Sequence, residues 1–315
     1  HCRRALRHTG RHAVRLFRAT AGPGADWLER PAYVPDHHAQ RRHRDVAAGV
    51  SMTTSTQPVF SLHYVGLNLK KGVNAATFEA FLKARGTQIP AYPGWQWSLL
   101  KGLRGERQEQ YLMLYQAPSQ PEYDRYITPT GALTAEAIAF WQQRPEASAL
   151  LEEWKNFATY GELPTLFSTF SLLAENRHSS LPPGPNFQPD AQPAVARVVG
   201  FHHLALRTGV TAADFDRFMI ENVARIDDYP GWKFHILKGT GGNRSEQYAV
   251  MLVIESLDSL NSFHPAMDVS TEKSLTFVKN HQESERMYDE WRTMASFSGA
   301  PQMYTDYLTI AGNVG

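Results

Sequence analysis

Histidines are the residues of this chain best suited to proton transfer, because an imidazole titrates near neutral pH. Five of them lie after residue 200, namely His202, His203, His235, His264 and His281. We predict that His203 acts as a general base or acid and that His235 stabilises the anion left by proton removal. Each prediction has a structural alternative, in which His203 is a satisfied core residue and His235 occupies an exposed sheet position.

An arginine and several aromatic and acidic residues complete the predicted site. Arg244 is a second candidate for stabilising an anion, and Arg107 holds the corresponding place earlier in the chain. An Arg two residues before a Glu shares its face of an extended chain, so it can pair with that Glu or clamp an anionic group. The Arg-x-Glu-Gln-Tyr pattern at both places favours a structural ion pair. We predict that five residues bind the substrate: Trp232, Phe234, Glu246, Tyr248 and Asp306.

The sequence lacks the residue patterns that several other classes of chemistry require. Cys2 is the single cysteine, which excludes a disulfide framework and argues against a cysteine-bound metal. The sequence contains no Walker loop and no Gly-x-Ser-x-Gly elbow. Residues 239–242 are rich in glycine but precede a predicted strand, so they do not form a dinucleotide-binding loop. We therefore expect no metal and no cofactor, and the cysteine usage predicts a cytoplasmic protein.

Residues 1–51 differ in composition from the rest of the chain. They hold ten Arg, no Lys and four acidic residues, whereas the whole chain has a net charge of only +1. We interpret them as a basic leader that is either non-native or disordered, and Met52 as a natural start. A transit peptide and a nucleic-acid-binding arm are the alternatives. The remaining sequence has no basic cluster indicating nucleic acid, and no apolar run nears the ~18 residues that a membrane span requires.

The chain repeats itself at a constant offset of 137 residues. Residues Tyr92-Pro93-Gly94-Trp95 return as Tyr229-Pro230-Gly231-Trp232, and the match continues without a gap from Leu62 to Leu173. A self-match at a fixed spacing indicates copies of one folding unit. We therefore predict two related domains and a Pro-rich linker between them that suits an exposed spacer. The predicted boundaries are 58–175 for the first domain, 176–196 for the linker and 197–313 for the second domain.

Both copies contain the same order of predicted elements. The predicted strands cover 62–69, 95–101, 109–116 and 166–173 in the first copy, and 199–206, 232–238, 246–253 and 303–310 in the second. One helical segment follows the first strand of each copy, and a longer one precedes the last strand, over 120–160 and 257–297. This β-α-β-β-α-β order is the split βαβ, ferredoxin-like arrangement, which leaves one face of its sheet bare.

The bare faces lead to a prediction for the whole molecule. We expect an α+β fold of two tandem ferredoxin-like domains, whose antiparallel sheets face each other as an intramolecular α/β barrel. Alternation along the first strand of the second copy places Leu204 and Leu206 towards the helices. The same alternation places His203 in the barrel interior, where we expect the substrate pocket.

The element order, the Pro-Gly-Trp turn before the second strand and the duplication resemble the dimeric α/β-barrel superfamily over about residues 62–310. That superfamily includes antibiotic-biosynthesis-type monooxygenases, EthD-like proteins and chlorite-dismutase-like haem proteins. The resemblance is one of topology and assigns no single family. A competing resemblance links residues 201–206 to the opening strand of glyoxalase-like, vicinal-oxygen-chelate proteins, in which a strand His binds a divalent metal. Gly66 replaces that His in the first copy, which favours the barrel.

These observations lead to one leading hypothesis and two alternatives. The resemblance implies a cofactor-independent oxygenase or isomerase that acts on a small hydrophobic or aromatic molecule. The first alternative is a haem-binding protein of the chlorite-dismutase-like type, with a His of the second copy as axial ligand. The second is a non-catalytic ligand-binding or stress-response protein. We expect a monomer or homodimer, with neither nucleic acid nor membrane as partner.

Overall fold

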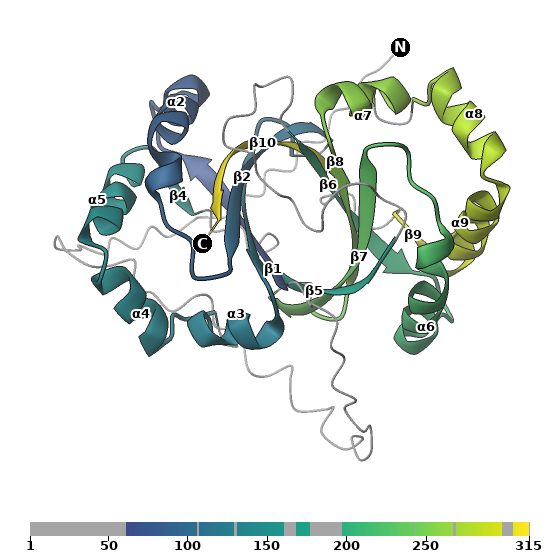
Figure 1. Cartoon of the computed structure of the whole chain (residues 1–315), viewed down its shortest axis with the longest axis horizontal. Coiled ribbons are helices and arrows are strands. Elements are labelled where there is room, and N and C mark those ends of the chain that lie inside the picture. The colour runs from purple at the N-terminus through teal and green to yellow at the C-terminus, as the bar shows by residue number, and fades with distance from the viewer. Residues whose placement is uncertain are drawn as a thin grey trace, which may run out of the picture.

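Antiparallel strands form the centre of the molecule, and helices lie outside them (Figure 1). The computed structural model describes residues 61–105, 107–128, 131–160, 168–176, 197–242, 244–266, 269–297 and 305–314. The predicted leader, 1–51, and all but the first residue of the predicted linker, 176–196, lie outside the described residues. The domain boundaries therefore stay predictions.

The first half of the described chain contains five strands and four α-helices. The strands are β1 (Ser61–Leu69), β2 (Gln96–Gly105), β3 (Tyr111–Ala117), β4 (Ala158–Tyr160) and β5 (Ser168–Glu175). The helices are α2 (Ala75–Arg85), α3 (Gln120–Tyr126), α4 (Ala135–Gln142) and α5 (Pro145–Trp154), and a 3-10 turn (Gly86–Gln88) follows α2. The helical segment predicted over 120–160 thus consists of three separate helices.

The second half repeats this order with nearly the same spacing. Its strands are β6 (Val198–Leu206), β7 (Trp232–Gly242), β8 (Tyr248–Ile254), β9 (Ala295–Ser296) and β10 (Thr305–Val314). Its helices are α6 (Ala212–Asn222), α7 (Leu257–Phe263), α8 (Glu272–Asn280) and α9 (Gln282–Met294), with a 3-10 turn (Val223–Arg225) after α6. Helices α2 and α3 and strand β3 each recur exactly 137 residues later, as α6, α7 and β8.

The strands belong to one sheet rather than to two separate ones. Within the halves the hydrogen-bonded orders are β5-β1-β3-β2 and β10-β6-β8-β7. Strand β10 also pairs with β2, and β5 also pairs with β7, so both halves are joined edge to edge. The expected mixture of helices with an antiparallel sheet is present. The edge pairings join the two halves into one sheet, and the predicted barrel of two facing sheets stays a prediction.

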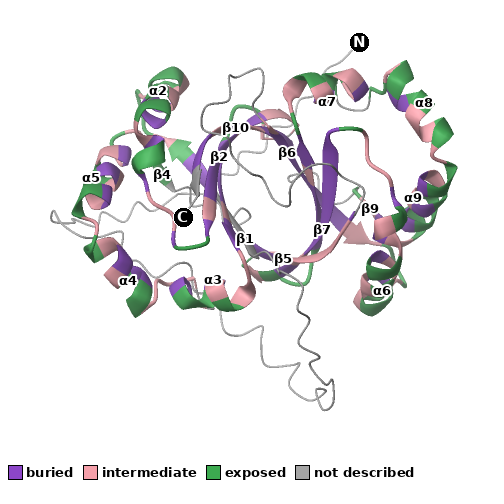
Figure 2. Cartoon of the chain, in the orientation of Figure 1, coloured by how far each residue is buried: buried purple, intermediate pink, exposed green. Residues whose placement is uncertain are grey.

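A cluster of apolar side chains lies on the common inner face of this sheet. It draws members from β2, β3, β5, β6, β7, β8 and β10, namely Leu100, Leu112, Leu114, Phe170, Val199, Phe201, Leu237, Ala249, Met251, Val253 and Tyr307. Figure 2 shows how strongly the burial follows the strands. Each large apolar side chain removed from water contributes roughly 1.5–3 kcal/mol, so this cluster is a main source of stability. These buried side chains occupy the face of the sheet on which we expected the pocket.

Helix starts show that local signals were duplicated together with the sequence. Asn74 caps α2 and Thr211 caps α6, and Ser119 and Ser256 cap α3 and α7 in the same way. In every case the side-chain oxygen accepts a hydrogen bond from a backbone N–H in the first turn, which would otherwise lack a partner. Asn74 and Thr211 lie 137 residues apart, as do Ser119 and Ser256. The helices of both halves therefore begin at equivalent places.

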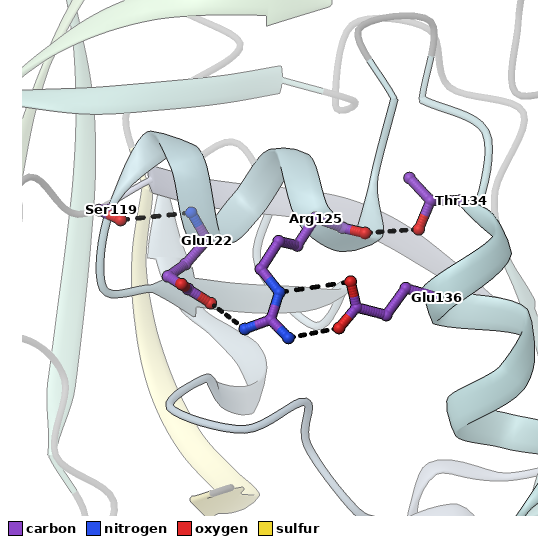
Figure 3. Close-up of polar contacts among 5 residues, drawn as sticks. All are labelled: Ser119, Glu122, Arg125, Thr134 and Glu136. Atoms are coloured by element: carbon purple, nitrogen blue, oxygen red, sulfur yellow. Dashed lines mark hydrogen bonds and ion pairs between the residues drawn. The ribbon is translucent and has the colours of Figure 1, made fainter.

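The ion pairs between α3 and α4 were not duplicated, because Ser262 stands at the position equivalent to Arg125. Arg125 of α3 forms ion pairs with Glu122 and with Glu136 of α4 (Figure 3). The Thr134 hydroxyl, which caps α4, also donates to the Arg125 carbonyl at 2.5 Å, and this contact does recur, between the Thr271 hydroxyl and the Ser262 carbonyl at 2.8 Å. All three charged side chains are exposed, so water screens the pairs and they contribute little to stability. The pairs therefore orient α3 against α4 more than they stabilise the fold.

The hairpin loops explain why β3 and β8 start two residues later than predicted. Glu109 and Glu246 adopt positive φ angles of 64° and 62°, which ends the extended chain before each strand. The Glu109 side chain pairs with Lys101 at 3.0 Å instead of with an arginine. The Arg244 guanidinium donates to the side-chain oxygen of Gln247 at 2.9 Å. The predicted Arg–Glu pair on one strand face is thus replaced by these two contacts.

Candidate functional site

A cavity of about 450 Å³ lies in the second half, between the helix-facing side of the sheet and helices α8 and α9. Its volume falls in the range of about 300–1,000 Å³ that is typical of small-molecule sites. Strands β6, β7 and β8 supply one wall, and α7, α8 and α9 supply the other. The strand wall consists mainly of Leu204, Trp232, Phe234, Val250, Leu252 and Ile254.

The strand wall follows from the pleat, because residues two apart point to the same side. Trp232 and Phe234 of β7 therefore share the cavity face, and Trp291 of α9 faces them with its ring 6.3 Å from that of Phe234. The Trp232 indole N–H donates to the Ser259 hydroxyl at 3.1 Å, which holds the ring in place. The wall is flat, aromatic and apolar, and it suits an apolar ligand.

Three polar residues meet at one side of this cavity: His202, Asp306 and Arg104. His202 Nε2 lies 3.0 Å from Asp306 Oδ1, and Arg104 Nε donates to Asp306 Oδ2 at 2.6 Å. The side chains of His202 and Asp306 are almost fully buried, with 8% and 3% of their surfaces exposed. A buried carboxylate that contacts two basic side chains orients both of them.

Strand pairing explains how residues so far apart in sequence meet. In the β10 ladders, Asp306 lies opposite Arg104 of β2 on one side and opposite Gly200 of β6 on the other. His202 is two residues after Gly200, so it projects from the same face of β6. A Cβ atom at position 200 would lie 2.7 Å from Asp306 Oδ1 and 3.2 Å from His202 Nε2. Only glycine leaves room for this contact.

The electrostatics of Asp306 determine the protonation of the cluster. Burial by itself would raise the pKa of Asp306, but the hydrogen bond with His202 and the charges of His202 and Arg104 lower the pKa below its usual value. Asp306 is therefore ionised near neutral pH, and His202 Nε2 carries the proton that it accepts. In that tautomer the second ring nitrogen, Nδ1, carries no proton.

Two further histidines border the cavity. His264 Nδ1 lies 3.3 Å from the Val269 carbonyl, and its Nε2 lies 3.3 Å from the Tyr229 hydroxyl, so both ring nitrogens have contacts. His281 Nδ1 lies 2.7 Å from the Phe277 carbonyl, and the two rings stack with centroids 3.9 Å apart. Burial lowers the pKa of His264, so this histidine is neutral near pH 7.

The equivalent region of the first half is filled by side chains. Trp141 and Tyr123 occupy the positions at which the second half has the smaller Val278 and Leu260. Trp141 donates its indole N–H to the Tyr92 hydroxyl at 2.9 Å within a cluster of stacked aromatic rings. The polar residues are missing as well, because Val65, Thr169 and Ile127 replace His202, Asp306 and His264. The duplicated halves thus differ at the residues that open and equip the cavity.

Three of the predicted site residues border the cavity, and the others do not. Trp232, Phe234 and Asp306 are part of its lining. Tyr248 is buried on the same side of the sheet, but its hydroxyl donates to Asp216 at 2.5 Å. Glu246 is exposed and lies 3.7 Å from Lys238, and Arg244 contacts Gln247 as described above.

The two histidines that we predicted as catalytic lie on the inner face of the sheet instead. The His203 ring is 5.8 Å from that of Phe170, and burial followed by the charges of Arg244, His202 and Arg107 lowers the pKa of His203 to about 3. His235 Nε2 lies 3.4 Å from Glu175 Oε2, which also pairs with Lys233 at 3.0 Å. The structure brings neither histidine to the cavity lining.

His202, Arg104, His264 and Tyr229 are the residues of this site that sequence reasoning missed. His202 stands next to His203 in the sequence, and strand alternation already placed it on the helix side with Leu204. We expected the pocket on the opposite side, so that signal was not used. Arg104 comes from the other half, and no local pattern connects it to His202.

Comparisons with known proteins give similarity in fold without a family. No protein-family model matches the chain, and neither does any curated protein sequence. A solved monooxygenase-like protein from Lactobacillus acidophilus NCFM is 12% identical, with a TM-score of 0.42, over 82% of this chain and 96% of that one. An anthrone oxidase-like protein has 12% identity and a TM-score of 0.39, over 82% of this chain and 93% of that one.

A chlorite dismutase-like structure is similar at 10% identity and a TM-score of 0.38, covering 80% of this chain and 95% of that one. At this level of similarity we draw nothing about activity, cofactor or substrate from these structures. Among the described residues, no group of three or more His, Cys, Asp or Glu side chains is arranged to hold a metal ion. The helices within those residues are all too short or too polar to cross a bilayer.

Proposed function

We propose that the protein is an enzyme that removes a proton from a small, largely apolar substrate held in the second-half cavity. The observation that carries this proposal is the buried His202–Asp306 contact of 3.0 Å on an aromatic-walled cavity. The role of general base that we predicted for His203 is thereby assigned to His202. The aromatic wall supports a substrate with a flat or ring-shaped apolar body.

The chemistry of the proposed step follows from the charges. His202 Nδ1 takes a proton from a weakly acidic C–H or O–H group of the substrate, and the electron pair stays on the substrate as an anion. The ionised Asp306 stabilises the resulting imidazolium, and Arg104 keeps Asp306 ionised. The substrate anion then remains next to a cation inside a cavity with apolar walls, where their attraction is strong. Such an anion can react with dioxygen or take its proton back elsewhere, as in an oxygenase or an isomerase.

Anthrone is a suitable probe for proton removal, because it is flat, apolar and carries a weakly acidic CH₂ group. Its anion consumes dioxygen to give anthraquinone and water, and exchange of the CH₂ protons in D₂O reports proton removal directly. We expect the wild-type protein to accelerate both processes over buffer. His202→Ala should lower the rate by about 100-fold or more, which is the usual contribution of a general base.

His203→Ala is the matched control, because His203 adjoins His202 in sequence but faces the opposite side of the sheet. We expect little change in the anthrone rate for this variant once its folding has been verified by circular dichroism. An equal loss in both variants, or an unchanged rate in His202→Ala, would reject His202 as the base. Probe binding without turnover would support the non-catalytic ligand-binding alternative instead.

A haem-binding function is the second candidate, and one observation favours it. Haem iron is commonly held by a histidine, and a ligating histidine usually donates its other ring N–H to a carbonyl or carboxylate. His281 fits this pattern, because its Nδ1 contacts the Phe277 carbonyl at 2.7 Å and the residue borders the cavity. Haem would supply one-electron and oxygen chemistry at the aromatic wall.

Titration with haemin tests this candidate through the Soret band. If the cavity holds haem, the wild-type protein should give a shifted and saturable Soret band, and His281→Ala should weaken binding strongly. His264→Ala is the control, because both ring nitrogens of His264 are already engaged. Identical spectra for wild-type protein and His281→Ala would exclude His281 as the ligand.

We also propose that the two halves act as the intramolecular α/β barrel expected from the sequence. The β10–β2 and β5–β7 pairings and the shared apolar cluster support this view. In that arrangement the packed barrel is a scaffold, and the substrate site lies outside it, between sheet and helices.

A further inference from the structure

The carboxyl group of Asp228 borders the same cavity as His202 and Asp306. Asp228 lies in the loop before β7, and the equivalent residue of the first half is Ala91. The acid is therefore specific to the half that has the cavity, as His202 and Asp306 are. Asp228 Oδ2 accepts a hydrogen bond from the side-chain amide of Asn176 at 2.5 Å.

Asn176 holds Asp228 in a well-defined position. Asn176 is fully buried. Its side-chain Oδ1 accepts a hydrogen bond from the Phe234 backbone N–H at 3.3 Å, and its backbone N–H donates to the Phe234 carbonyl at 3.4 Å. Phe234 is part of the cavity wall. Hydrogen bonds of the Asn176 side chain thus link the Asp228 carboxyl group to β7, the strand that carries the aromatic wall of the cavity.

Four acidic residues of the described part of the chain line the cavity, namely Asp227, Asp228, Glu285 and Asp306, and among them Asp228 and Asp306 have opposite surroundings. Asp306 contacts His202 and Arg104, whereas within the described ranges no Lys, Arg or His nitrogen lies within 4 Å of the Asp228 carboxyl. The cation Lys233 is nearby but pairs with Glu175 at 3.0 Å. The ionisable groups that influence Asp228 are Asp227 and Tyr229 from its own loop, Lys233 from β7 and Tyr288 from α9.

These surroundings favour the neutral acid. Burial raises the pKa of Asp228 to about 7, and the charge of Asp227 acts in the same direction. The hydrogen bonds from Asn176 and the Phe234 backbone, and the charge of Lys233, only partly offset this. Two carboxyl groups whose surroundings push their pKa values apart are a frequent arrangement for acid–base catalysis.

We propose that Asp228 is the proton donor of this cavity and that, with His202 as the base, it makes the reaction an isomerisation in which a proton moves from one substrate atom to another. This inference rests on the proposed function of His202. Of the two reactions left open under the proposed function, oxygenation and isomerisation, this inference selects isomerisation. The substrate class is a small apolar molecule with an acidic C–H group and a conjugated position that accepts a proton, such as a β,γ-unsaturated ketone.

The step needs no oxidant, reductant or second substrate. His202 removes a proton from the carbon between the carbonyl group and the double bond, and the C–H electron pair forms a dienolate. The Asp228 hydroxyl gives its proton to the γ-carbon, so that the double bond moves into conjugation with the carbonyl group. Imidazolium and carboxylate remain, and transfer of one proton from His202 to Asp228 through solvent restores the starting state.

The probe is 3-cyclohexen-1-one, whose isomerisation to 2-cyclohexen-1-one is followed by the absorbance of the conjugated enone. Uptake of deuterium at the α-carbon of recovered substrate in D₂O is followed separately by mass spectrometry. We expect Asp228→Asn to keep α-deuteration but to lose isomerisation by about 100-fold, and Asp228→Glu to restore part of it. Asp289→Asn, an exposed α9 residue outside the cavity, should behave like the wild-type protein.

The two readouts separate this inference from the proposal on which it rests. Absence of both α-deuteration and isomerisation in the wild-type protein would reject His202 as a base and this inference with it. Normal α-deuteration together with an unchanged isomerisation rate in Asp228→Asn would overturn Asp228 as the donor and leave His202 standing. Loss of both readouts in a folded Asp228→Asn would also overturn it, because a proton donor acts only in the second step.

The wild-type protein provides a second measurement in case Asp228→Asn does not fold. A donor must be protonated, so the isomerisation rate should fall as the pH rises through about 7, where Asp228 loses its proton. α-Deuteration needs only the base and should not fall over the same range. A parallel fall of both rates, or an isomerisation rate that keeps rising above pH 8, would overturn the assignment.

Discussion

At the scale of single residues, the strand pleat separates two adjacent histidines into different roles. His202 faces the cavity and contacts Asp306, whereas His203 faces the apolar inner cluster and is only 1% exposed. Burial lowers the pKa of His203 to about 3, so this histidine is neutral in the folded protein over the physiological range. A neutral imidazole in the core makes the stability of the protein depend on pH. It has no part in the proposed catalytic step.

This difference predicts a pH-dependent stability. The unfolded chain binds a proton at His203 below its usual pKa of 6.5, whereas the folded chain binds it only near pH 3. Stability contributed by His203 is therefore lost as the pH falls through this window, by up to about 1.4 kcal/mol per pH unit. His203→Leu should reduce this slope. Urea unfolding of wild-type and variant protein at pH 7, 5 and 4 measures it, and parallel stability curves would contradict the assignment.

At the scale of elements, the hairpins before β3 and β8 depend on one glycine each. Gly102 and Gly239 lie 137 residues apart, and each meets the backbone of its own loop. A Cβ atom on Gly239 would lie 1.8 Å from the Arg244 carbonyl oxygen, a distance that no side chain can tolerate. The loop must therefore open if any other residue stands at this position. Its opening would disturb the β7–β8 ladder, which carries Trp232 and Phe234.

Two alanine substitutions in the same strand test this dependence. Gly239→Ala should destabilise the protein by about 2 kcal/mol or more, because it forces a backbone shift. Gly241→Ala should change stability by less than about 1 kcal/mol, because its added Cβ would make only an ordinary contact of 3.7 Å with Thr169. Thermal unfolding followed by circular dichroism compares them. Equal effects would show that the close approach in the loop is not what requires Gly239.

At the scale of the whole molecule, duplication gave one half that is packed and one half that is open. Trp141 and Tyr123 fill the first half, and their smaller counterparts, Val278 and Leu260, leave the cavity in the second. The site nevertheless needs both halves, because Arg104 of β2 reaches Asp306 through the β10–β2 pairing. The second half provides the cavity and the first half provides the cation of Arg104. The proposed site therefore requires both halves of the sheet.

Exchanging one residue between the halves tests this comparison. Val278→Trp introduces the residue of the packed half and should block probe binding while leaving the melting temperature unchanged or higher, because it fills the cavity. Leu275→Trp is the control on the same helix, since Leu275 is 61% exposed and does not border the cavity. Haemin or anthrone binding measures the effect. Retained binding in Val278→Trp would place the ligand elsewhere.

Much of the fold could be predicted because its signals are local and occur twice. Apolar alternation, helix caps such as Asn74 and Thr211, and the turn glycines act within a few residues, and a constant offset repeats them. The strands predicted at 62–69 and 199–206 agree with β1 and β6 to within one residue. The long helical segments were harder, because Pro145 starts a new helix inside one of them.

The candidate site also has features that local sequence signals predict and features that they do not. The sequence by itself determined which half is rich in histidine, which residues alternate on β6 and β7, and that Asp306 has no acidic counterpart in the first half. Only the tertiary structure decided which face of the sheet is open, because the volumes of side chains from several helices determine whether a space is filled. It also decided that Arg104 lies beside Asp306, since a strand pairing between residues about 200 positions apart leaves no pattern in the chain.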